Sequence, residues 1–258
     1  MNRVALVTGA ARGIGAATVR RLAGDGWSVV ATDVCADDPA LPYPMATRAE
    51  LDALASLGDV TTVVADVRDL DALAGAVQTA VETYGGLDAA LAIAGVVAGG
   101  APHWETDPAG ERVVLDVDLV GVLNLARVAT PALLQRPEPR SGRFVAVSSA
   151  AAVRGLDGLA AYCAAKAGVT GFVRALATDL GGSGVTANCV SPGSTLTPAL
   201  EASARLYDLE SINDFAKQQP ISRLLDADEI AAAIAWLAGP DSSGMTGSVM
   251  AVDGGLSV

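Results

Sequence analysis

The sequence is poor in cysteine, histidine and aromatic residues, and it contains no long apolar run. Its three cysteines, Cys35, Cys163 and Cys189, include no CxxC pair, and with one histidine they indicate neither a disulfide framework nor a zinc site. No apolar stretch approaches the roughly 20 residues that span a bilayer, and residues 1–3 lead into the first apolar run without a secretory leader. We therefore expect a cytoplasmic protein without a metal or a membrane segment.

Basic residues are scarce as well. The 17 lysines and arginines stand against 29 acidic residues, and the net charge of -12 disfavours nucleic acid and anionic membranes as partners. Hydrophobic residues make up 51% of the chain and aromatic residues 4%, so Ala, Val, Leu and Ile must build the core, as in helix-covered parallel sheets. A length of 258 residues suits one α/β domain, and we expect one domain over residues 1–258.

Strand and helix signals alternate along the chain. Apolar runs predict strands at residues 4–8, 29–32, 61–65, 87–94, 143–147, 186–190 and 248–252, and helices at 13–24, 69–84, 107–134, 159–180 and 226–238. The alternation predicts an α/β Rossmann fold with a doubly wound, mostly parallel, seven-stranded sheet, helices on both faces and a ligand at the carboxyl ends of the strands. The long helices 107–134 and 159–180 are apolar beyond one face, which predicts a homo-oligomer, a dimer or tetramer.

A glycine-rich turn, TGAARGIG, follows the first predicted strand. Gly9 permits a tight turn, Gly13 lets backbone N–H groups approach a pyrophosphate, and Gly15 lets the next helix pack closely. The second predicted strand ends in Asp33, whose carboxylate is placed to accept hydrogen bonds from the adenosine ribose and to repel a 2′-phosphate. Arg12 taken alone favours NADP, but Asp33 is the stronger signal, so we expect NAD.

Ser149, Tyr162 and Lys166 form a candidate proton relay. Tyr162 and Lys166 lie one helical turn apart, so the ammonium can approach the phenol and lower its pKa toward the working range. Tyr162 would then act as general acid or base, and Ser149 would polarise the substrate oxygen. The alternative is a chance surface pair on a helix.

Together these segments resemble the classical short-chain dehydrogenase/reductase family over nearly the whole chain. The matching segments are TGAARGIG (8–15), Asp66-Val67, Ala94-Gly95, VSS (147–149), YCAAK (162–166), Asn188, SPG (191–193) and VDGG (252–255). The resemblance implies a catalytic role for Ser149, Tyr162 and Lys166, and an NAD-dependent interconversion of an alcohol and a carbonyl. It also implies cofactor contacts from Gly9, Arg12, Gly13, Ile14, Gly15, Asp33, Asp66, Val67, Ala94, Gly95, Tyr162, Lys166, Pro192, Gly193 and Thr195.

A long segment with three prolines follows Asp33 and departs from the family pattern. The prolines at 39, 42 and 44 predict an irregular loop over residues 35–45, before a helix that begins near Thr47. The segment resembles the mycofactocin-associated branch of the family, which implies that NAD stays bound through turnover and passes its electrons to mycofactocin, a peptide-derived carrier. The alternative is a tolerated surface insertion.

Asp118 is the second departure, because the family usually has a catalytic asparagine there. In relatives that asparagine is implied to hold a helix distortion. An ionised carboxylate accepts hydrogen bonds but donates none, and it would strengthen the ammonium form of a nearby lysine. We therefore expect Asp118 to belong to the catalytic group and to alter its pH dependence.

Residues 96–104, 150–158 and 194–222 are expected to form the substrate pocket. Their apolar residues predict a small, uncharged alcohol or ketone; the candidate walls are Val96, Val97, Trp104, Val153, Leu156, Leu196, Leu200, Leu206 and Phe215. His103, the only histidine, is expected to be a surface residue rather than a catalyst. The alternatives are a freely exchanging NAD(P)-dependent carbonyl or 3-oxoacyl reductase, an isomerase or dehydratase, and a catalytically impaired NAD-binding regulatory protein.

Overall fold

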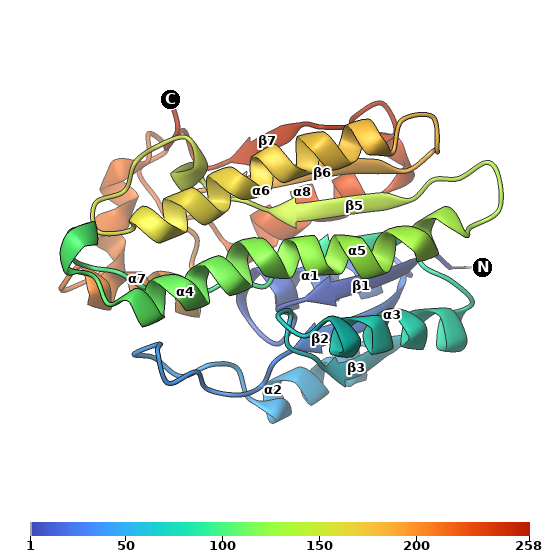
Figure 1. Ribbon diagram of the computed structural model, residues 1–258, viewed down its shortest axis with the longest axis horizontal. Helices are drawn as coiled ribbons and strands as arrows, with labels where there is room; N and C mark the ends of the chain where they lie inside the picture. The colour runs from blue at the N-terminus through green and yellow to red at the C-terminus, as the bar shows by residue number, and fades with distance from the viewer. Residues whose placement is uncertain (1) are drawn as a thin grey trace.

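A seven-stranded parallel sheet forms the centre of the computed structural model, which describes residues 2–258 (Figure 1). Its strands are β1 (Val4–Thr8), β2 (Ser28–Asp33), β3 (Val60–Val64), β4 (Ala89–Ala92), β5 (Arg143–Val147), β6 (Thr186–Pro192) and β7 (Val249–Val252). They lie in the order β3-β2-β1-β4-β5-β6-β7, and neighbouring strands are parallel. The strand order changes direction between β1 and β4, where the carboxyl ends of the strands open a crevice. The predicted doubly wound sheet is confirmed.

Helices cover both faces of this sheet. The helices α1 (Gly13–Gly24) and α8 (Ala227–Ala238) lie on one face, and α3 (Leu70–Tyr84), α4 (Pro108–Leu115), α5 (Gly121–Leu134) and α6 (Ala160–Asp179) lie on the other, in front in Figure 1. The shorter helices are α2 (Arg48–Ala53) and α7 (Pro198–Leu206), with 3-10 turns at Leu54–Leu57, His103–Glu105, Ala150–Ala152, Ile212–Gln218 and Pro240–Ser242. Within residues 2–258, no helix is both long and apolar enough to cross a membrane.

The predicted helix 107–134 is interrupted. A π-helical turn, η3 (Asp116–Val120), separates α4 from α5. Inside this turn the side chain of Asp118 faces inward and accepts a hydrogen bond from the backbone nitrogen of Val96 at 2.8 Å. A π turn holds one residue more than an ordinary helical turn, and here it coincides with the contact between Asp118 and Val96. Apolar spacing along the helix carries no sign of that contact and did not predict the break.

The helix α7 lies in the segment 194–222, where no element was predicted. Thr197 precedes it, and its hydroxyl accepts a hydrogen bond from the backbone nitrogen of Leu200. Pro198 occupies the first helical position, where a missing N–H group costs nothing. These two signals, a capping threonine followed by proline, were sufficient to predict α7 from the sequence.

Candidate active site

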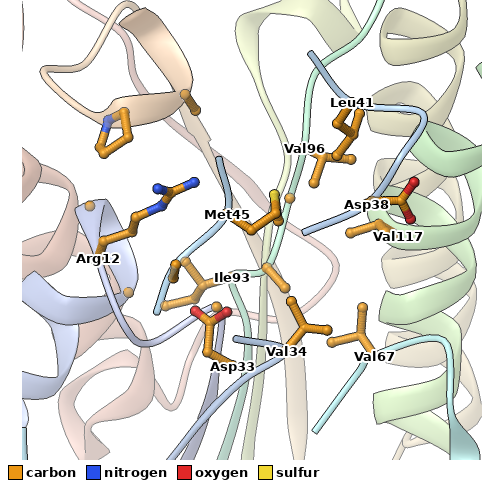
Figure 2. A pocket seen from close by; sticks show the side chains of 18 of the residues that line it. Arg12, Asp33, Val34, Asp38, Leu41, Met45, Val67, Ile93, Val96 and Val117 are labelled. Atoms are coloured by element: carbon orange, nitrogen blue, oxygen red, sulfur yellow. The ribbon is translucent and has the colours of Figure 1, made fainter. Parts of the chain in front are cut away.

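Two adjoining cavities open at the carboxyl ends of the strands. The first, about 160 Å³, lies over the glycine-rich turn and is here named the glycine-turn cavity (Figure 2). The second, about 570 Å³, contains Ser149, Tyr162 and Lys166 and is named the tyrosine cavity. Ile14 and Gly95 line both cavities, so the two are parts of one crevice.

The cofactor residues expected from the sequence all line this crevice. The glycine-turn cavity has Gly9, Arg12, Gly13, Ile14, Gly15, Asp33, Asp66, Val67, Ala94 and Gly95, and the tyrosine cavity has Tyr162, Lys166, Pro192, Gly193 and Thr195. They come from loops that follow five different strands, β1 to β3 and then β4 and β6, together with α6. The fold therefore brings together residues that are up to about 190 positions apart in the chain, as a switch-point crevice requires.

The glycine-rich turn leaves a cradle against the start of α1. Gly9 has a φ of 64°, and a Cβ atom there would lie 2.6 Å from the Cα of Ala94. A Cβ atom at Gly15 would overlap the carbonyl group of Gly9. The backbone at Gly9 thus lies directly against that of Ala94, and the backbone at Gly15 against that of Gly9. The positive end of the α1 dipole borders the cavity. This arrangement fits the pyrophosphate of a dinucleotide.

Asp33 ends β2 and is buried at 8% exposure. One carboxylate oxygen, Oδ2, accepts a hydrogen bond from the backbone nitrogen of Ala11 at 3.0 Å, and Figure 2 shows the carboxylate directed into the cavity. The sequence predicted a ribose contact but not the contact with Ala11. Asp33 therefore holds the glycine-rich turn and leaves its second oxygen, Oδ1, as an acceptor for a ribose hydroxyl.

An apolar slot continues from Asp33. Val34, Val67 and Val117 surround it in Figure 2, and Val67 is buried at 7% exposure. Asp66, the neighbour of Val67, is held by the guanidinium of Arg68, whose Nη2 lies 2.7 Å from Oδ2. A slot with branched aliphatic walls fits the flat face of an adenine ring.

Residues 35–46 form the outer wall of the glycine-turn cavity and are here named the cover loop. The loop contains neither helix nor strand, as its prolines predicted, and α2 begins directly after Thr47, whose side chain caps it. Leu41, Tyr43 and Met45 line the cavity from this loop, and Leu41 is buried at 7% exposure. The loop thus contributes apolar wall and is more than a surface insertion.

Besides apolar packing, polar contacts at three points tie the cover loop to the rest of the described chain. The guanidinium of Arg12 donates to the carbonyl oxygen of Pro44 at 3.0 Å, and that of Arg68 pairs with Asp38 at 2.8 Å. The hydroxyl of Tyr43 accepts a hydrogen bond from the backbone nitrogen of Val97 at 2.9 Å. Because Val97 also lines the tyrosine cavity, the cover loop reaches across both halves of the crevice.

The predicted relay residues converge in the tyrosine cavity. Ser149 follows β5, and its Oγ accepts a hydrogen bond from the backbone nitrogen of Ala151 at 3.1 Å. Tyr162 and Lys166 lie one turn apart in α6, with Lys166 Nζ 5.5 Å from the centre of the Tyr162 ring. Lys166 Nζ also donates to the carbonyl oxygen of Val147 at 3.3 Å.

Asp118 joins this group from the π turn. Its side chain is fully buried, and its Oδ2 lies 3.2 Å from Lys166 Nζ. Its Oδ1 accepts the hydrogen bond from Val96 described above. Oδ2 has no other polar partner within the described part of the chain, so the ammonium of Lys166 is its counter-charge. The structure therefore places a buried carboxyl group beside Lys166 where the resemblance implies asparagine; burial raises the pKa of Asp118, and the Lys166 ammonium opposes this rise.

The pKa values of this group differ from the simple expectation. Burial raises the pKa of Tyr162 above its usual value; the Lys166 ammonium and a hydrogen bond with Ser149 lower it, while the Asp118 charge raises it again. The sequence predicted that Lys166 would bring the pKa of Tyr162 down, and the net direction found here is upward. Burial lowers the pKa of Lys166, but Asp118 and Tyr162 outweigh burial and raise it, so Lys166 remains an ammonium.

Five of the nine predicted substrate walls line the tyrosine cavity, namely Val96, Val97, Leu156, Leu200 and Phe215. The predictions for Trp104, Val153, Leu196 and Leu206 were wrong. Trp104 and Val153 are 82% and 74% exposed, because their 3-10 turns direct them outward, Leu196 is 42% exposed, and Leu206 packs beside the cavity against Val97 and Leu159 without lining it.

Several residues that line the tyrosine cavity were not named among the predicted walls, although Tyr207 and Leu209 lie in the predicted segment 194–222. Leu159, Tyr207, Leu209 and Leu256 also line this cavity. Leu256 lines the cavity from the segment after β7, and no local sequence pattern predicts this contact. His103 lies outside both cavities, and its Nδ1 is 2.8 Å from Glu111 Oε1, which agrees with the expected surface position.

Comparison with known proteins agrees with this geometry. A family model described as enoyl-(acyl carrier protein) reductase matches residues 9–257. Cis-4-hydroxycyclohexanecarboxylate dehydrogenase of Sinomonas cyclohexanicum is 41% identical over 98% of this chain and 96% of that protein. (-)-Trans-carveol dehydrogenase of Rhodococcus erythropolis is 35% identical over 100% of this chain and 98% of that protein.

A solved structure shares the architecture. Carveol dehydrogenase from Mycobacterium avium, in complex with NAD, superimposes with a TM-score of 0.92 at 32% identity, covering 98% of this chain and 97% of that chain. Similarity at this level extends over the sheet, the helices and both cavities, rather than over one motif. The chain therefore belongs to the classical short-chain dehydrogenase/reductase family.

Proposed function

We propose that the whole chain is one NAD-binding domain and that the protein is an NAD-dependent oxidoreductase interconverting an alcohol and a carbonyl. The convergence of Ser149, Tyr162 and Lys166 in a cavity that continues into the glycine-rich cradle carries this proposal. The cradle suits the pyrophosphate of NAD, the acceptor at Asp33 suits the adenosine ribose, and the apolar slot suits the adenine ring. Two of the relatives are named for cyclic alcohols, cis-4-hydroxycyclohexanecarboxylate and (-)-trans-carveol, and the apolar walls of the tyrosine cavity suit such a substrate.

The side chains divide the chemistry of alcohol oxidation among themselves. When bound, NAD supplies the nicotinamide ring that accepts the hydride from the alcohol carbon. Tyr162, as phenolate, accepts the hydroxyl proton, and Ser149 hydrogen-bonds the same oxygen. Lys166 stabilises the phenolate by its charge. The alcohol thus loses one proton and one hydride, which accounts for both hydrogens and both electrons that separate it from the carbonyl.

The test is Tyr162→Phe, which removes the ionisable oxygen and keeps the ring. We expect turnover of cyclic alcohols to fall by roughly 100-fold or more, with NAD affinity nearly unchanged. Tyr207→Phe is the matched control, because Tyr207 lines the same cavity but donates its hydroxyl to the carbonyl oxygen of Asp157. Activity of Tyr162→Phe near that of the parent would contradict the assigned role.

We further propose that the cover loop makes the bound NAD slow to leave, and that mycofactocin takes its electrons. The three ties of the loop, at Arg12, Arg68 and Tyr43, must all break before the outer wall of the glycine-turn cavity opens. Release slower than chemistry would make NAD a resident group, and an external carrier would then be needed for repeated turnover.

Purified protein should accordingly carry NAD through gel filtration and release it on denaturation. Shortening the loop between Ala36 and Thr47 should make the cofactor exchange freely, while Tyr162→Phe, which leaves the loop intact, should retain it. Protein that is purified empty and forms free NADH at the full catalytic rate would instead be a freely exchanging dehydrogenase.

We also propose a cytoplasmic homo-oligomer, a dimer or tetramer, without nucleic-acid or membrane partners. The helices α4 and α5 run end to end on one face in Figure 1, α6 lies beside them, and α4 and α6 are in contact. Val120, on this face, leaves 41% of its surface exposed. Light scattering at working concentration should give a mass of two or four chains, and a monomer would exclude this assembly.

A further inference from the structure

The tyrosine cavity contains one cation that the proposed chemistry does not use. Four charged residues line the cavity: Asp118, Arg154, Asp157 and Lys166. Asp118 and Lys166 neutralise each other as a buried pair. Arg154 and Asp157 remain, and both are exposed at the rim. The apolar walls predicted an uncharged substrate, so a positive group at this rim needs an explanation.

Arg154 is held at the cavity but is not neutralised there. It follows the 3-10 turn after Ser149, and its backbone nitrogen donates to the carbonyl oxygen of Ala150 at 3.0 Å. Its Nη1 donates to the carbonyl oxygen of Leu256 at 2.9 Å. Among residues 2–258, no carboxylate oxygen lies within 4.0 Å of its guanidinium, so its charge has no partner at the cavity wall.

The anchor at Leu256 fixes the guanidinium beside the substrate space. Leu256 itself lines the cavity, so the hydrogen bond holds the cation at the cavity wall rather than in bulk solvent. A guanidinium has five N–H donors, and one of them is used here. The donors left over can bind both oxygens of a carboxylate in a fork geometry.

We propose that Arg154 binds a carboxylate of the substrate, so the substrate is a small hydroxy acid with an apolar body. This inference rests on the proposed function: the hydroxyl lies at Tyr162 and Ser149, and Leu156, Leu159 and Phe215 enclose the body. A single carboxylate suits the site better than a phosphate-bearing thioester, because Asp157 stands at the same rim and the chain carries a net charge of -12.

Binding provides a test that does not require turnover. In NAD-loaded protein, calorimetry should show cyclohexanecarboxylate binding about tenfold more tightly than cyclohexanecarboxamide, its uncharged isostere. Arg154→Gln keeps a donor for Leu256 but removes the charge, and it should abolish this preference. Arg205→Gln is the control, since Arg205 is exposed on α7 and lies outside the cavity. Equal binding of acid and amide by the parent, or an equal loss in both variants, would overturn the proposal.

Kinetics distinguish this inference from the proposed function. The parent should oxidise 4-hydroxycyclohexanecarboxylate with a kcat/KM about tenfold above that for 4-hydroxycyclohexanecarboxamide, and Arg154→Gln should lower only the former. If both compounds are oxidised equally, the role of Arg154 is wrong and the proposed function stands. If neither compound nor any other alcohol is oxidised while the acid still binds through Arg154, the proposed function fails alone. If the protein prefers a hydroxyacyl-coenzyme A thioester and this preference depends on Arg154, then Arg154 binds a phosphate of coenzyme A rather than a substrate carboxylate. That result would overturn the proposal.

Discussion

Asp118 sets the charge balance at the catalytic centre. A buried carboxylate 3.2 Å from Lys166 Nζ offsets the ammonium that would otherwise act on Tyr162 alone. Its charge is one of the causes that raise the pKa of Tyr162, after burial. Oxidation requires the phenolate, so the rate of alcohol oxidation should rise with pH as Tyr162 ionises.

Replacing Asp118 by Asn should move that rise to lower pH. The substitution removes a negative charge that raises the pKa of Tyr162, and it keeps an oxygen that can accept from Val96. The measurement is the pH profile of kcat with NAD and a cyclic alcohol. Asp116→Asn, in the same π turn but outside both cavities, should leave the profile unchanged. A shift to higher pH would show that Asp118 acts in another way.

Asp33 should determine the choice between NAD and NADP. Asp33→Ser removes the ribose acceptor and the negative charge, and we expect the Kd for NAD to rise about tenfold while NADP binds better than before. Asp33→Asn separates the two effects, because its amide oxygen can still accept from Ala11 while the charge is lost. Titration of cofactor-free protein with both nucleotides measures the result, and a parent that prefers NADP would refute the assignment.

Residues with a local motif could be placed from the sequence, and residues without one could not. Ser149, Tyr162 and Lys166 sit at fixed spacings, and they do converge in one cavity. The contact of Asp33 with Ala11 joins two loops and has no signature along the chain. Trp104 was misplaced because apolar character does not tell which way a surface turn directs a side chain.

At the scale of elements, the ends of the helices carry the more readable signals. Asp69 was predicted to start a helix, and its carboxylate accepts hydrogen bonds from the backbone nitrogens of Asp71 and Ala72 at the start of α3. The spacing of apolar residues did not predict the break between α4 and α5, because the residues of the π turn continue an ordinary helical pattern; only the family resemblance at Asp118 implied a helix distortion there. A helix cap involves residues that are close in sequence, whereas this π turn goes with the contact of Asp118 with the distant Val96.

The cap of α8 provides a stability prediction at this scale. Glu229 accepts from the backbone nitrogen of Asp226 at 2.9 Å and pairs with both terminal nitrogens of Arg223 at 2.7 Å. The hydrogen bonds with Arg223 and then with Asp226 lower the pKa of Glu229 from 4.5 to about 2. A depressed carboxyl pKa contributes stability that is present above 4.5 and is lost as the pH falls toward 2.

Glu229→Gln keeps an oxygen that can accept from the Asp226 nitrogen but loses the charge that pairs with Arg223, so it should lower the free energy of unfolding at pH 7 by about 0.5 kcal/mol, the scale of a surface ion pair. The difference from the parent should shrink as the pH falls from 4.5 toward 2. Denaturant unfolding at a series of pH values measures it. Glu201→Gln, at an exposed position in the first turn of α7, is the control. A difference that stays constant with pH would mean that the carboxylate charge is not involved.

At the scale of the molecule, the crevice joins parts of the sheet that are distant in sequence. The glycine-turn cavity draws on the segments after β1, β2, β3, β4 and β6, and the tyrosine cavity adds those after β5 and β7. The alternating pattern predicted this meeting at the carboxyl ends of the strands, because parallel strands place their carboxyl ends at one edge. The loops determine the shape of the cavities, and the alternation of strands and helices does not predict the paths of the loops.

Binding of NAD should consequently stabilise the whole molecule. A ligand that binds only the folded state adds about 2.7 kcal/mol at a concentration 100 times its Kd, and for a chain of this size 1 kcal/mol moves Tm by about 2–4 °C. We expect stripping of NAD to lower Tm by roughly 5–10 °C, and saturating NAD to restore it. Protein with the cover loop shortened should behave the same at saturation but lose the gain on dilution, since its cofactor leaves. Differential scanning calorimetry of loaded, stripped and reloaded samples measures these shifts. A Tm that is unchanged by stripping would place the nucleotide outside the crevice, because a ligand that binds only the folded protein must shift its unfolding equilibrium.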